Sequence, residues 1–210
     1  MTITVFGANG KVGRLLVTEA IDRGFKVIAF IHASYDLPKN ANLIVVQGDV
    51  HNYVQVEKVI TDSDAVFSTL GSWGTTNKDI LSTGMKNIST AMKKHGIKRI
   101  ISLTGAGCRV PGFKEGFIQL LNRIPPSLFG RKVLRDAEEH IRILQNSNLD
   151  WTVLRSPIMN NLGNSNKYIV SRSCPFPNAT VNRKSVAKAM LDVLENKTFI
   201  QESPFIRRVG

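Results

Sequence analysis

Short apolar segments rich in Val and Ile alternate along the chain with longer segments whose apolar residues recur every three to four positions. The short segments predict strands buried on both faces, because they are continuously apolar rather than alternating. Strands are expected at residues 3–6, 26–31, 43–46, 65–70, 99–103 and 151–154. Helices are expected at about 11–23, 54–60, 80–95, 131–145 and 184–194. This order predicts an α/β fold, a doubly wound parallel sheet covered by helices.

Two stretches lack this regularity. Glycine and proline interrupt residues 105–130, which predicts a loop. The residues between the sixth strand and the helix at 184–194 show no clear period, and we expect them to be irregular. A last apolar stretch follows that helix.

Length and composition favour a single globular domain. The chain has 210 residues, of which 42% are hydrophobic and 21% charged, and it can bury a core without disulfides. It has no apolar run of about 18 residues and begins without a basic, apolar leader, so we expect no membrane span and no secretory signal. Cys108 and Cys174 lack the spacing of metal ligands, so we expect no metal site. These features predict a location in the reducing cytoplasm.

The net charge of +12 comes from one part of the chain. Residues 1–92 hold eight basic and eight acidic residues, whereas residues 93–210 hold twenty and eight. Such a field attracts anions, including nucleic acid, a phosphorylated cofactor or an acidic substrate, although a solvated basic face is the alternative. Base stacking requires aromatic residues among the basic ones, and those after residue 92 are scattered, so we do not expect a nucleic-acid partner.

A glycine-rich turn joins the first predicted strand to the first predicted helix. Residues 7–13 read GANGKVG, a G-x-x-G-x-x-G spacing. Gly7 would permit the tight turn, Gly10 would let the backbone approach a pyrophosphate, and Gly13 would let helix and strand pack closely. In this context we interpret the motif as the dinucleotide-binding turn of a Rossmann-like fold rather than a merely structural turn. The residues expected to bind cofactor here are Gly7, Asn9, Gly10, Lys11 and Val12.

Further motifs follow the later strands. They are GDV at 48–50, LG at 70–71, SLTG at 102–105 and NLDWTVLRSP at 148–157. With these motifs, most of the chain resembles the single-domain NAD(P)H-binding branch of the atypical short-chain dehydrogenase/reductase superfamily, which holds NmrA-like proteins and flavin/biliverdin-IXβ reductases. The resemblance implies that Asp49 and Val50 hold the adenine, although Asp49 could instead serve only as a turn residue. It also implies cofactor contacts from Leu70, Gly71, Thr104 and Pro157.

The end of the second strand bears on the choice between NADP and NAD. NAD-dependent proteins usually carry Asp or Glu here, which binds the ribose 2′-OH and repels a 2′-phosphate. In this chain the strand is followed by His32, Ala33 and Ser34, with no carboxylate before Asp36. His32 stands where related reductases carry an arginine, so His32 and Ser34 could donate to the phosphate, with Lys39 nearby. We therefore expect NADP(H) rather than NAD(H); the alternative is that His32 only ends the strand.

The tyrosine that most of the superfamily uses for catalysis is absent. Tyrosine-dependent relatives carry a Tyr-x-x-x-Lys pair on the helix after the fifth strand, but that helix starts at Arg131, and no tyrosine lies between Tyr53 and Tyr168. The one matching spacing, Tyr35 to Lys39, follows the second strand and contains a proline. A proline there opposes a helix, so these two residues cannot form the pair.

The flavin and biliverdin reductases also lack this tyrosine, and the present chain departs even from them. Their serine after the fifth strand falls at Gly105, and their histidine after the sixth falls at Ile158. What remains is a glycine-rich floor at residues 105–107, which suits a planar acceptor that takes hydride and collects its proton from water. Lys132 is the one catalytic candidate, to orient the nicotinamide ribose or attract an acidic substrate, unless it is a solvated helix end. Cys108 is interpreted as a packing thiol.

Two functions fit these patterns. The first, which we favour, is an NAD(P)H-dependent oxidoreductase that prefers NADPH and passes hydride to a planar, anionic or aromatic acceptor such as a flavin, quinone or tetrapyrrole. The alternative is a non-catalytic NADP(H)-binding sensor of NmrA-like type. We expect residues 1–210 to form one domain, with 105–130 and 156–210 shaping the substrate side, and a monomer or homodimer. The histidines at 51, 95 and 140 show no ligand spacing and are interpreted as surface or core residues.

Overall fold

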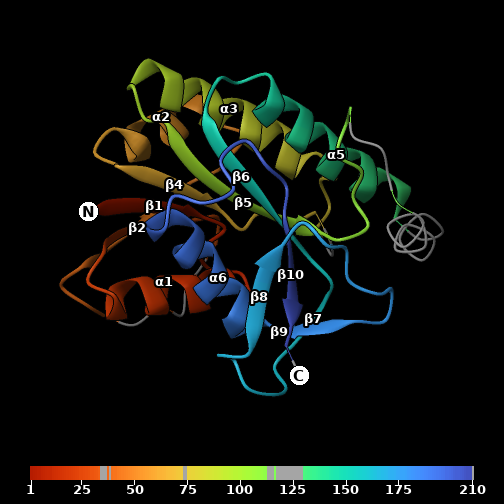
Figure 1. The fold of residues 1–210 in the computed structure, drawn as a ribbon. Coiled ribbons are helices and arrows are strands. Elements are labelled where there is room, and N and C mark those ends of the chain that lie inside the picture. The colour runs from red at the N-terminus through yellow and green to blue at the C-terminus, as the bar shows by residue number, and fades with distance from the viewer. Residues whose placement is uncertain (34–36, 38, 73–74, 113–115, 117–129, 210) are drawn as a thin grey trace.

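Strands and helices alternate along the chain as the apolar pattern predicts (Figure 1). The computed structural model describes residues 1–33, 37, 39–72, 75–112, 116 and 130–209. The strands are β1 (Thr2–Phe6), β2 (Lys26–Ile31), β3 (Leu43–Gln47), β4 (Ala65–Ser68), β5 (Arg99–Gly105), β6 (Asp150–Ser156), β7 (Ile158–Asn160), β8 (Tyr168–Ser171), β9 (Thr180–Asn182) and β10 (Phe205–Arg208). The helices are α1 (Gly13–Asp22), α2 (Tyr53–Ile60), α3 (Ile80–Lys94), α5 (Arg131–Gln145) and α6 (Arg183–Glu195).

The main sheet has the strand order β3-β2-β1-β4-β5-β6-β10-β8 within the described residues. Neighbouring strands are parallel except β10 and β8, which are antiparallel. The chain winds outward from β1 to β3 and then outward on the other side from β4, so the winding reverses between β1 and β4. The predicted Rossmann-like, doubly wound sheet is therefore confirmed. Ligands of such sheets bind beyond the carboxyl ends of the strands, next to this reversal.

Helices cover both faces of the sheet (Figure 1). One apolar core joins the sheet to α1 and α6, and a second joins it to α2, α3 and α5. Strand β1 shows why its sequence is continuously apolar. Ile3 and Val5 belong to the first core and Phe6 to the second, while the buried Thr4 hydroxyl donates to the carbonyl of Val59 on α2 at 3.0 Å.

The stretch after β6 differs from its predicted irregular structure. It contains β7 and β9, which form a small parallel pair, and β8, which lies antiparallel to β10 at the end of the main sheet. These strands have only three or four residues and are mostly half-buried or exposed, so their apolar period is too short to recognise. Within the predicted loop at 105–130, residues 113–115 and 117–129 lie outside the described residues.

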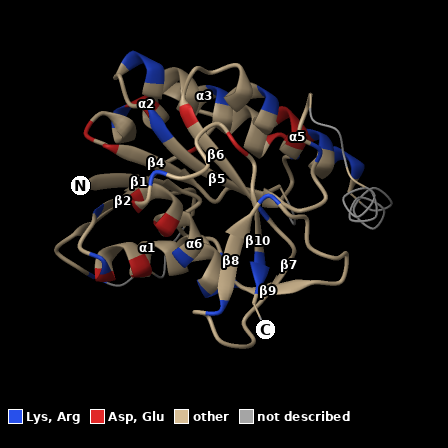
Figure 2. Cartoon of the chain, viewed as in Figure 1, with Lys and Arg blue, Asp and Glu red and all other residues tan. Residues whose placement is uncertain are grey.

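The charged residues are spread over several elements (Figure 2). Lys and Arg occur on α2, α3, α5 and β10, and acidic residues lie between the basic ones on α5. In the described part of the chain, no helix is both long and apolar enough for a membrane crossing.

Candidate functional site

A cleft of about 520 Å³ opens beyond the carboxyl ends of β1, β2, β3 and β4. Its walls come from the turns that follow these four strands and from the residues that lead into α3. The cleft therefore lies beside the reversal of the sheet, where a ligand is expected. Its volume falls within the range of small-molecule and cofactor sites.

The turn after β1 forms the floor of the cleft and depends on glycine. Gly7 has φ +75°, and a Cβ there would lie 2.9 Å from the carbonyl carbon of Thr69. A Cβ on Gly13 would overlap the Gly7 carbonyl oxygen and come within 2.8 Å of the Cα of Ala8. The Gly10 N–H donates to the Gly7 carbonyl at 2.9 Å. The tight turn predicted for Gly7 and the close helix–strand packing predicted for Gly13 are confirmed, although α1 begins at Gly13 rather than at residue 11.

The structure brings most of the predicted cofactor residues to this cleft. Those that line it are Gly7, Asn9, Gly10, His32, Asp49, Val50, Leu70 and Gly71. Lys11, Val12, Thr104 and Pro157 are not among the residues that line it. Lys11 is exposed, whereas the Thr104 side chain is buried, with its hydroxyl 3.2 Å from the Cys108 sulfur. Ser34 lies outside the described residues, as does Tyr35 of the rejected Tyr-x-x-x-Lys match.

Lys132 lies at the start of α5 and lines a different, shallow pocket of about 370 Å³. Lys78 and Asp79 line that pocket too, whereas Asn77 and Ile80 line the cleft, so one short segment borders both spaces. The assignment of Lys132 as a catalytic residue remains a prediction.

The wall at the end of β2 and β3 is apolar beneath and polar at its rim. Phe30 lies under the wall, and Gly48 passes so close to its ring that a Cβ would come within 2.7 Å of it. Beyond Phe30, the exposed His32 and Ala33 follow β2. Neither residue carries a negative charge, so this part of the rim can accept a phosphate without direct repulsion.

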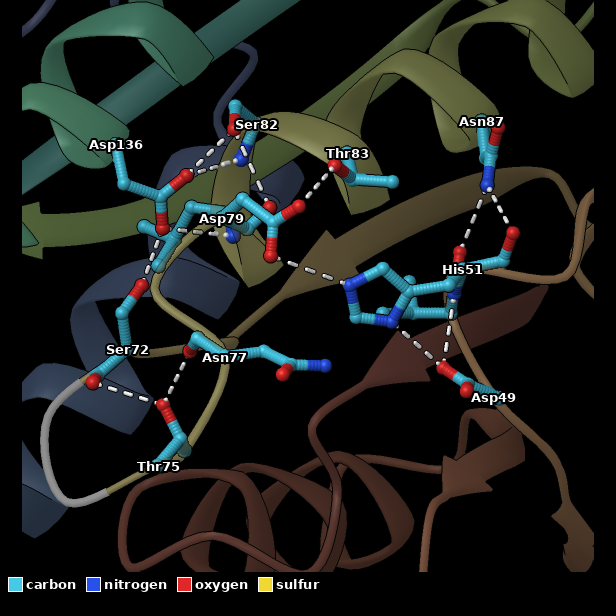
Figure 3. A network of polar contacts seen from close by, with 12 residues as sticks. Asp49, His51, Ser72, Thr75, Asn77, Asp79, Ser82, Thr83, Asn87 and Asp136 are labelled. Carbon is cyan, nitrogen blue, oxygen red and sulfur yellow. Dashed lines mark hydrogen bonds and ion pairs between the residues drawn. The ribbon is translucent and has the colours of Figure 1, made fainter.

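A histidine joins two carboxylates at the rim of the cleft after β3 (Figure 3). His51 Nδ1 donates to Asp49 Oδ1 at 2.8 Å, and its Nε2 lies 3.5 Å from Asp79 Oδ1. Hydrogen bonds from the backbone and ring of His51 lower the pKa of Asp49, whereas the hydrogen bond to Asp49 raises the pKa of His51. His51 is partly exposed and lines the cleft, a position that its interpretation as a surface or core residue did not specify.

A buried carboxylate positions the segment that leads into α3 (Figure 3). Asp136 of α5 accepts from the N–H of Leu81 at 3.0 Å and from the N–H and hydroxyl of Ser82 at 2.8 and 2.6 Å. It also accepts from the Ser72 hydroxyl. Asp79 occupies the N-cap position of α3, but its side chain makes no capping hydrogen bond, so Asp136 accepts from the free N–H groups of the first turn instead. One side chain thus fixes both ends of the segment that closes the cleft.

The carboxyl ends of β5 and β6 are closed by bonds between their own side chains and backbones. The Ala106 N–H donates to the Ser156 carbonyl at 2.7 Å. Burial raises the pKa of the Cys108 thiol, which fits its interpretation as a packing residue. His140 is also a core residue: its Nδ1–H donates to the Ala137 carbonyl at 2.8 Å, so its Nε2 accepts from the Ser102 hydroxyl at 3.0 Å. Full burial lowers the pKa of His140 to about 4.

Several residues of the cleft were not predicted from the sequence. Thr69 follows β4 directly, because this strand ends at Ser68 rather than at residue 70. Its hydroxyl lies 3.0 Å from the carbonyl oxygens of both Phe6 and Gly7 and so supports the glycine turn. Thr75, Thr76 and Asn77 belong to an irregular segment that has no periodic signal. The remaining unpredicted lining residues are Phe30, Ile31, Ala33, Gly48, His51 and Ile80.

Comparison with known proteins identifies the family. A family model described as NAD(P)H-binding matches residues 7–197, nearly the whole chain. The chain belongs to this NAD(P)H-binding family. The glycine turn and the size of the cleft fit a dinucleotide. A side chain at Gly7 would collide with the backbone of Thr69 and Leu70, and one at Gly13 with the backbone of the turn itself.

Solved structures of other proteins share this fold over almost the whole length of the present chain. A short-chain dehydrogenase/reductase (wide type) of Veillonella parvula, in complex with NADP, is 21% identical with a TM-score of 0.81 and covers 100% of this chain and 95% of its own. ChuY, an anaerobilin reductase of Escherichia coli O157:H7, is 22% identical with a TM-score of 0.76 and covers 99% and 97%. The fold that the resemblance implied is confirmed.

A curated relative matches a shorter region. The 40 kDa subunit of mitochondrial NADH-ubiquinone oxidoreductase of Neurospora crassa is 28% identical over 116 residues, which are 49% of this chain and 30% of the relative. The chain matches about a third of the length of the curated relatives.

Proposed function

We propose that this NAD(P)H-binding protein is an oxidoreductase that prefers NADPH to NADH and passes hydride to a planar acceptor. The observation that carries the cofactor preference is the end of β2, where His32 and Ala33 line the cleft and neither is a carboxylate. An imidazole can donate to a 2′-phosphate, and it does so more strongly when protonated. The Veillonella structure, which contains NADP, supports testing this cofactor first.

The cleft residues divide into three groups along a bound dinucleotide. The turn of Gly7, Asn9 and Gly10 would hold the pyrophosphate, because the amides at the start of a helix favour an anion. Asp49 and Val50 would hold the adenine at the rim formed after β3. His32 would bind the 2′-phosphate of the adenosine ribose, together with Ser34. Leu70 and Gly71, after β4, would border the path toward the nicotinamide.

The acceptor would lie over the ends of β5 and β6. Bound NADPH supplies a hydride there. Gly105 is exposed, and among the described residues nothing lies within 4 Å of a Cβ built on it, which leaves room for a flat ring on this part of the surface. Ala106 and Cys108, which follow it closely in the chain, are buried. Flavin, quinone and tetrapyrrole-like rings fit this surface, and the anaerobilin reductase ChuY supports including the last class. The shaping of this side by residues 105–130 and 156–210 is part of the proposal.

Binding of the two cofactors tests the proposal directly. The dissociation constants of NADPH and NADH are measured by cofactor fluorescence for the wild type, His32→Ala and His32→Arg. We expect the wild type to bind NADPH more tightly, His32→Ala to weaken NADPH about tenfold without affecting NADH, and His32→Arg to restore NADPH binding. Equal affinity of the wild type for both cofactors would contradict the preference. His95→Ala is the matched control, because this histidine directly follows α3 and contacts Glu57 outside the cleft.

The composition of the cleft wall favours a second candidate, a sensor that binds NADP(H) without turnover. Among its described lining residues, the side chains that titrate are His32, Asp49 and His51, and all three lie on the adenine side. Ser102 and His140, which could have served a reaction, are buried and bonded to each other. Purified protein is mixed with NADPH and a panel of FMN, quinones and dyes. Cofactor oxidation supports the reductase, whereas tight NADPH binding without oxidation across the panel supports the sensor.

A further inference from the structure

The His51 bridge connects two segments that meet at the rim of the cleft. Asp49 and His51 belong to the turn between β3 and α2, and Asp79 immediately precedes α3. The ring of His51 lies between the two carboxylates, 2.8 Å from Asp49 and 3.5 Å from Asp79 (Figure 3). Its side chain is 27% exposed, whereas its Nε2 atom is buried on the side of Asp79.

The groups around the ring are themselves held in place. Asp49 Oδ1 also accepts from the His51 N–H at 2.9 Å, and Asp79 Oδ2 accepts from the Thr83 hydroxyl at 3.2 Å. The Asn87 amide donates to the carbonyls of Val50 and His51 at 2.9 and 3.2 Å. The ring is therefore held between carboxylates and a backbone that are themselves fixed by hydrogen bonds.

Asp49 and Asp79 are the main charged partners of the His51 ring, because the other groups nearby are neutral, are paired elsewhere or act only weakly. Helix α3 contributes the neutral Thr83 and Asn87. On α2, Glu57 is already paired with Lys94 and His95. Lys78, next to Asp79 in the chain, donates to the carbonyls of Ser72 and Thr75, the former at 3.4 Å. His32, which follows the neighbouring strand β2, acts weakly on Asp49.

These contacts set the charge that the rim presents to a ligand. With a protonated His51 the three side chains carry a net charge of −1, and with a neutral His51 they carry −2. A dinucleotide is itself an anion, and the 2′-phosphate of NADPH adds further negative charge. Repulsion at short range in a partly buried cleft costs more than in water. Protonation of His51 thus favours binding, and it favours the more anionic dinucleotide more.

We propose that His51 is a positioning residue for the cofactor: it orients Asp49 for the adenine, and its proton offsets the two rim carboxylates so that the cleft binds a dinucleotide more tightly. The proposal rests on the proposed function, because it assumes a dinucleotide in this cleft. By thermodynamic linkage the effect is reciprocal, so a bound dinucleotide must raise the affinity of His51 for its proton.

The test compares dissociation constants of NADH and NADPH between pH 6.5 and 9 for the wild type, His51→Asn and His95→Asn. Asparagine retains a neutral donor toward Asp49 but cannot take a proton. His95 is the matched control, a histidine 23% exposed that also contacts a carboxylate but lies outside the cleft. We expect wild-type affinity to fall about fivefold across this range, by more for NADPH than for NADH, and the His51→Asn profile to be flatter. His95→Asn should follow the wild type.

A second measurement does not depend on a variant. The titration of the His51 ring is followed by NMR in the wild-type protein with and without saturating NADH, which lacks the 2′-phosphate. We expect the pKa of the ring to rise when NADH binds, and an unchanged pKa overturns the proposal. Identical pH profiles of the wild type and His51→Asn overturn it while the proposed function stands. Failure of the wild type to bind either dinucleotide overturns both.

Discussion

Two groups of strand ends at the same edge of the sheet are built in different ways. The ends of β1–β4 surround an open cleft whose floor is backbone, shaped by Gly7 and Gly13. The ends of β5 and β6 are closed by contacts such as that between Thr104 and Cys108 and by Arg155, whose guanidinium lies 3.7 Å from the centre of the Phe205 ring. The shape of the first group depends on positions without a side chain, whereas the shape of the second depends on contacts between side chains.

This difference indicates at which part of the site a substitution can be tolerated. On the dinucleotide side, a Cβ added at Gly7 or Gly13 collides with backbone, so these two positions tolerate almost no change. On the proposed acceptor side, the surface at Gly105 has room among the described residues, so its chemistry can change while the fold stays intact. We expect the two sides to respond differently to an added methyl group, to a fall in pH and to the loss of a contact between them.

The largest effect is expected from adding one methyl group to the turn. Gly13→Ala places a Cβ against the Gly7 carbonyl and the Ala8 Cα, neither of which can move without opening the turn. We expect the free energy of unfolding to fall by more than about 3 kcal/mol and dinucleotide binding to be lost. Urea denaturation and cofactor fluorescence measure the two losses.

Gly105→Ala is the matched substitution on the other side. Its Cβ meets no described residue within 4 Å, so the free energy of unfolding should be unchanged or raised by up to about 1 kcal/mol. NADPH binding should also be unchanged. Equal losses from Gly13→Ala and Gly105→Ala would remove the contrast between the two sides.

A smaller but still large effect is expected from acid on the closed side. His140 has a pKa of about 4 when folded and about 6.5 when unfolded, so the unfolded chain binds the proton more readily. The stability due to neutral His140 is complete above pH 6.5 and is lost as the pH falls toward 4, by about 3 kcal/mol in total. Urea denaturation at a series of pH values measures this loss.

The paired variant Ser102→Ala/His140→Phe removes both the proton site and its partner. We expect its stability to change less with pH between 6.5 and 4 than that of the wild type. An equally steep profile would assign the acid sensitivity to other groups.

The smallest effect concerns the connection between the two sides. Asp136→Asn replaces a carboxylate that accepts from four donors with an amide that offers an acceptor on one side only. We expect a loss of about 2 kcal/mol in urea denaturation and weaker NADPH binding, because residues 77 and 80 line the cleft. Glu139→Gln, an exposed change on the same helix at the ion pair with Arg142, should cost under about 0.5 kcal/mol. A stable Asp136→Asn variant with unchanged NADPH affinity would show that the two sides are independent.

Most of the fold could be predicted because the main strands are buried on both faces. Ile3, Val5 and Phe6 show how this burial makes a strand continuously apolar. Gly24 and Gly96, with φ of +84° and +70°, follow α1 and α3, and a glycine in this conformation is a common signal for the end of a helix. Strands β7, β8 and β9 were missed because pairing with distant segments, rather than a local apolar run, makes them strands.

The site could be predicted where its residues directly follow a strand. The strand pattern located these residues because each lies one or two positions after the end of a strand. Gly7 and His32 directly follow β1 and β2, and Asp49 and Leu70 are the second residues after β3 and β4. The bridge from His51 to Asp79 joins residues 28 positions apart in the chain, and no spacing rule connects them. Asp136 is further still from the residues that it holds, so its role required the packed structure.

The turn after β1 is already shaped by the protein alone. Gly10 and Thr69 both bond to the Gly7 carbonyl, at 2.9 and 3.0 Å, so the loop has little freedom left to lose. A ligand that meets a rigid surface avoids an ordering step, and its arrival is then governed by diffusion and long-range attraction. NADPH and NADH should consequently associate at similar speeds, and the length of time for which each stays bound should account for the difference between them.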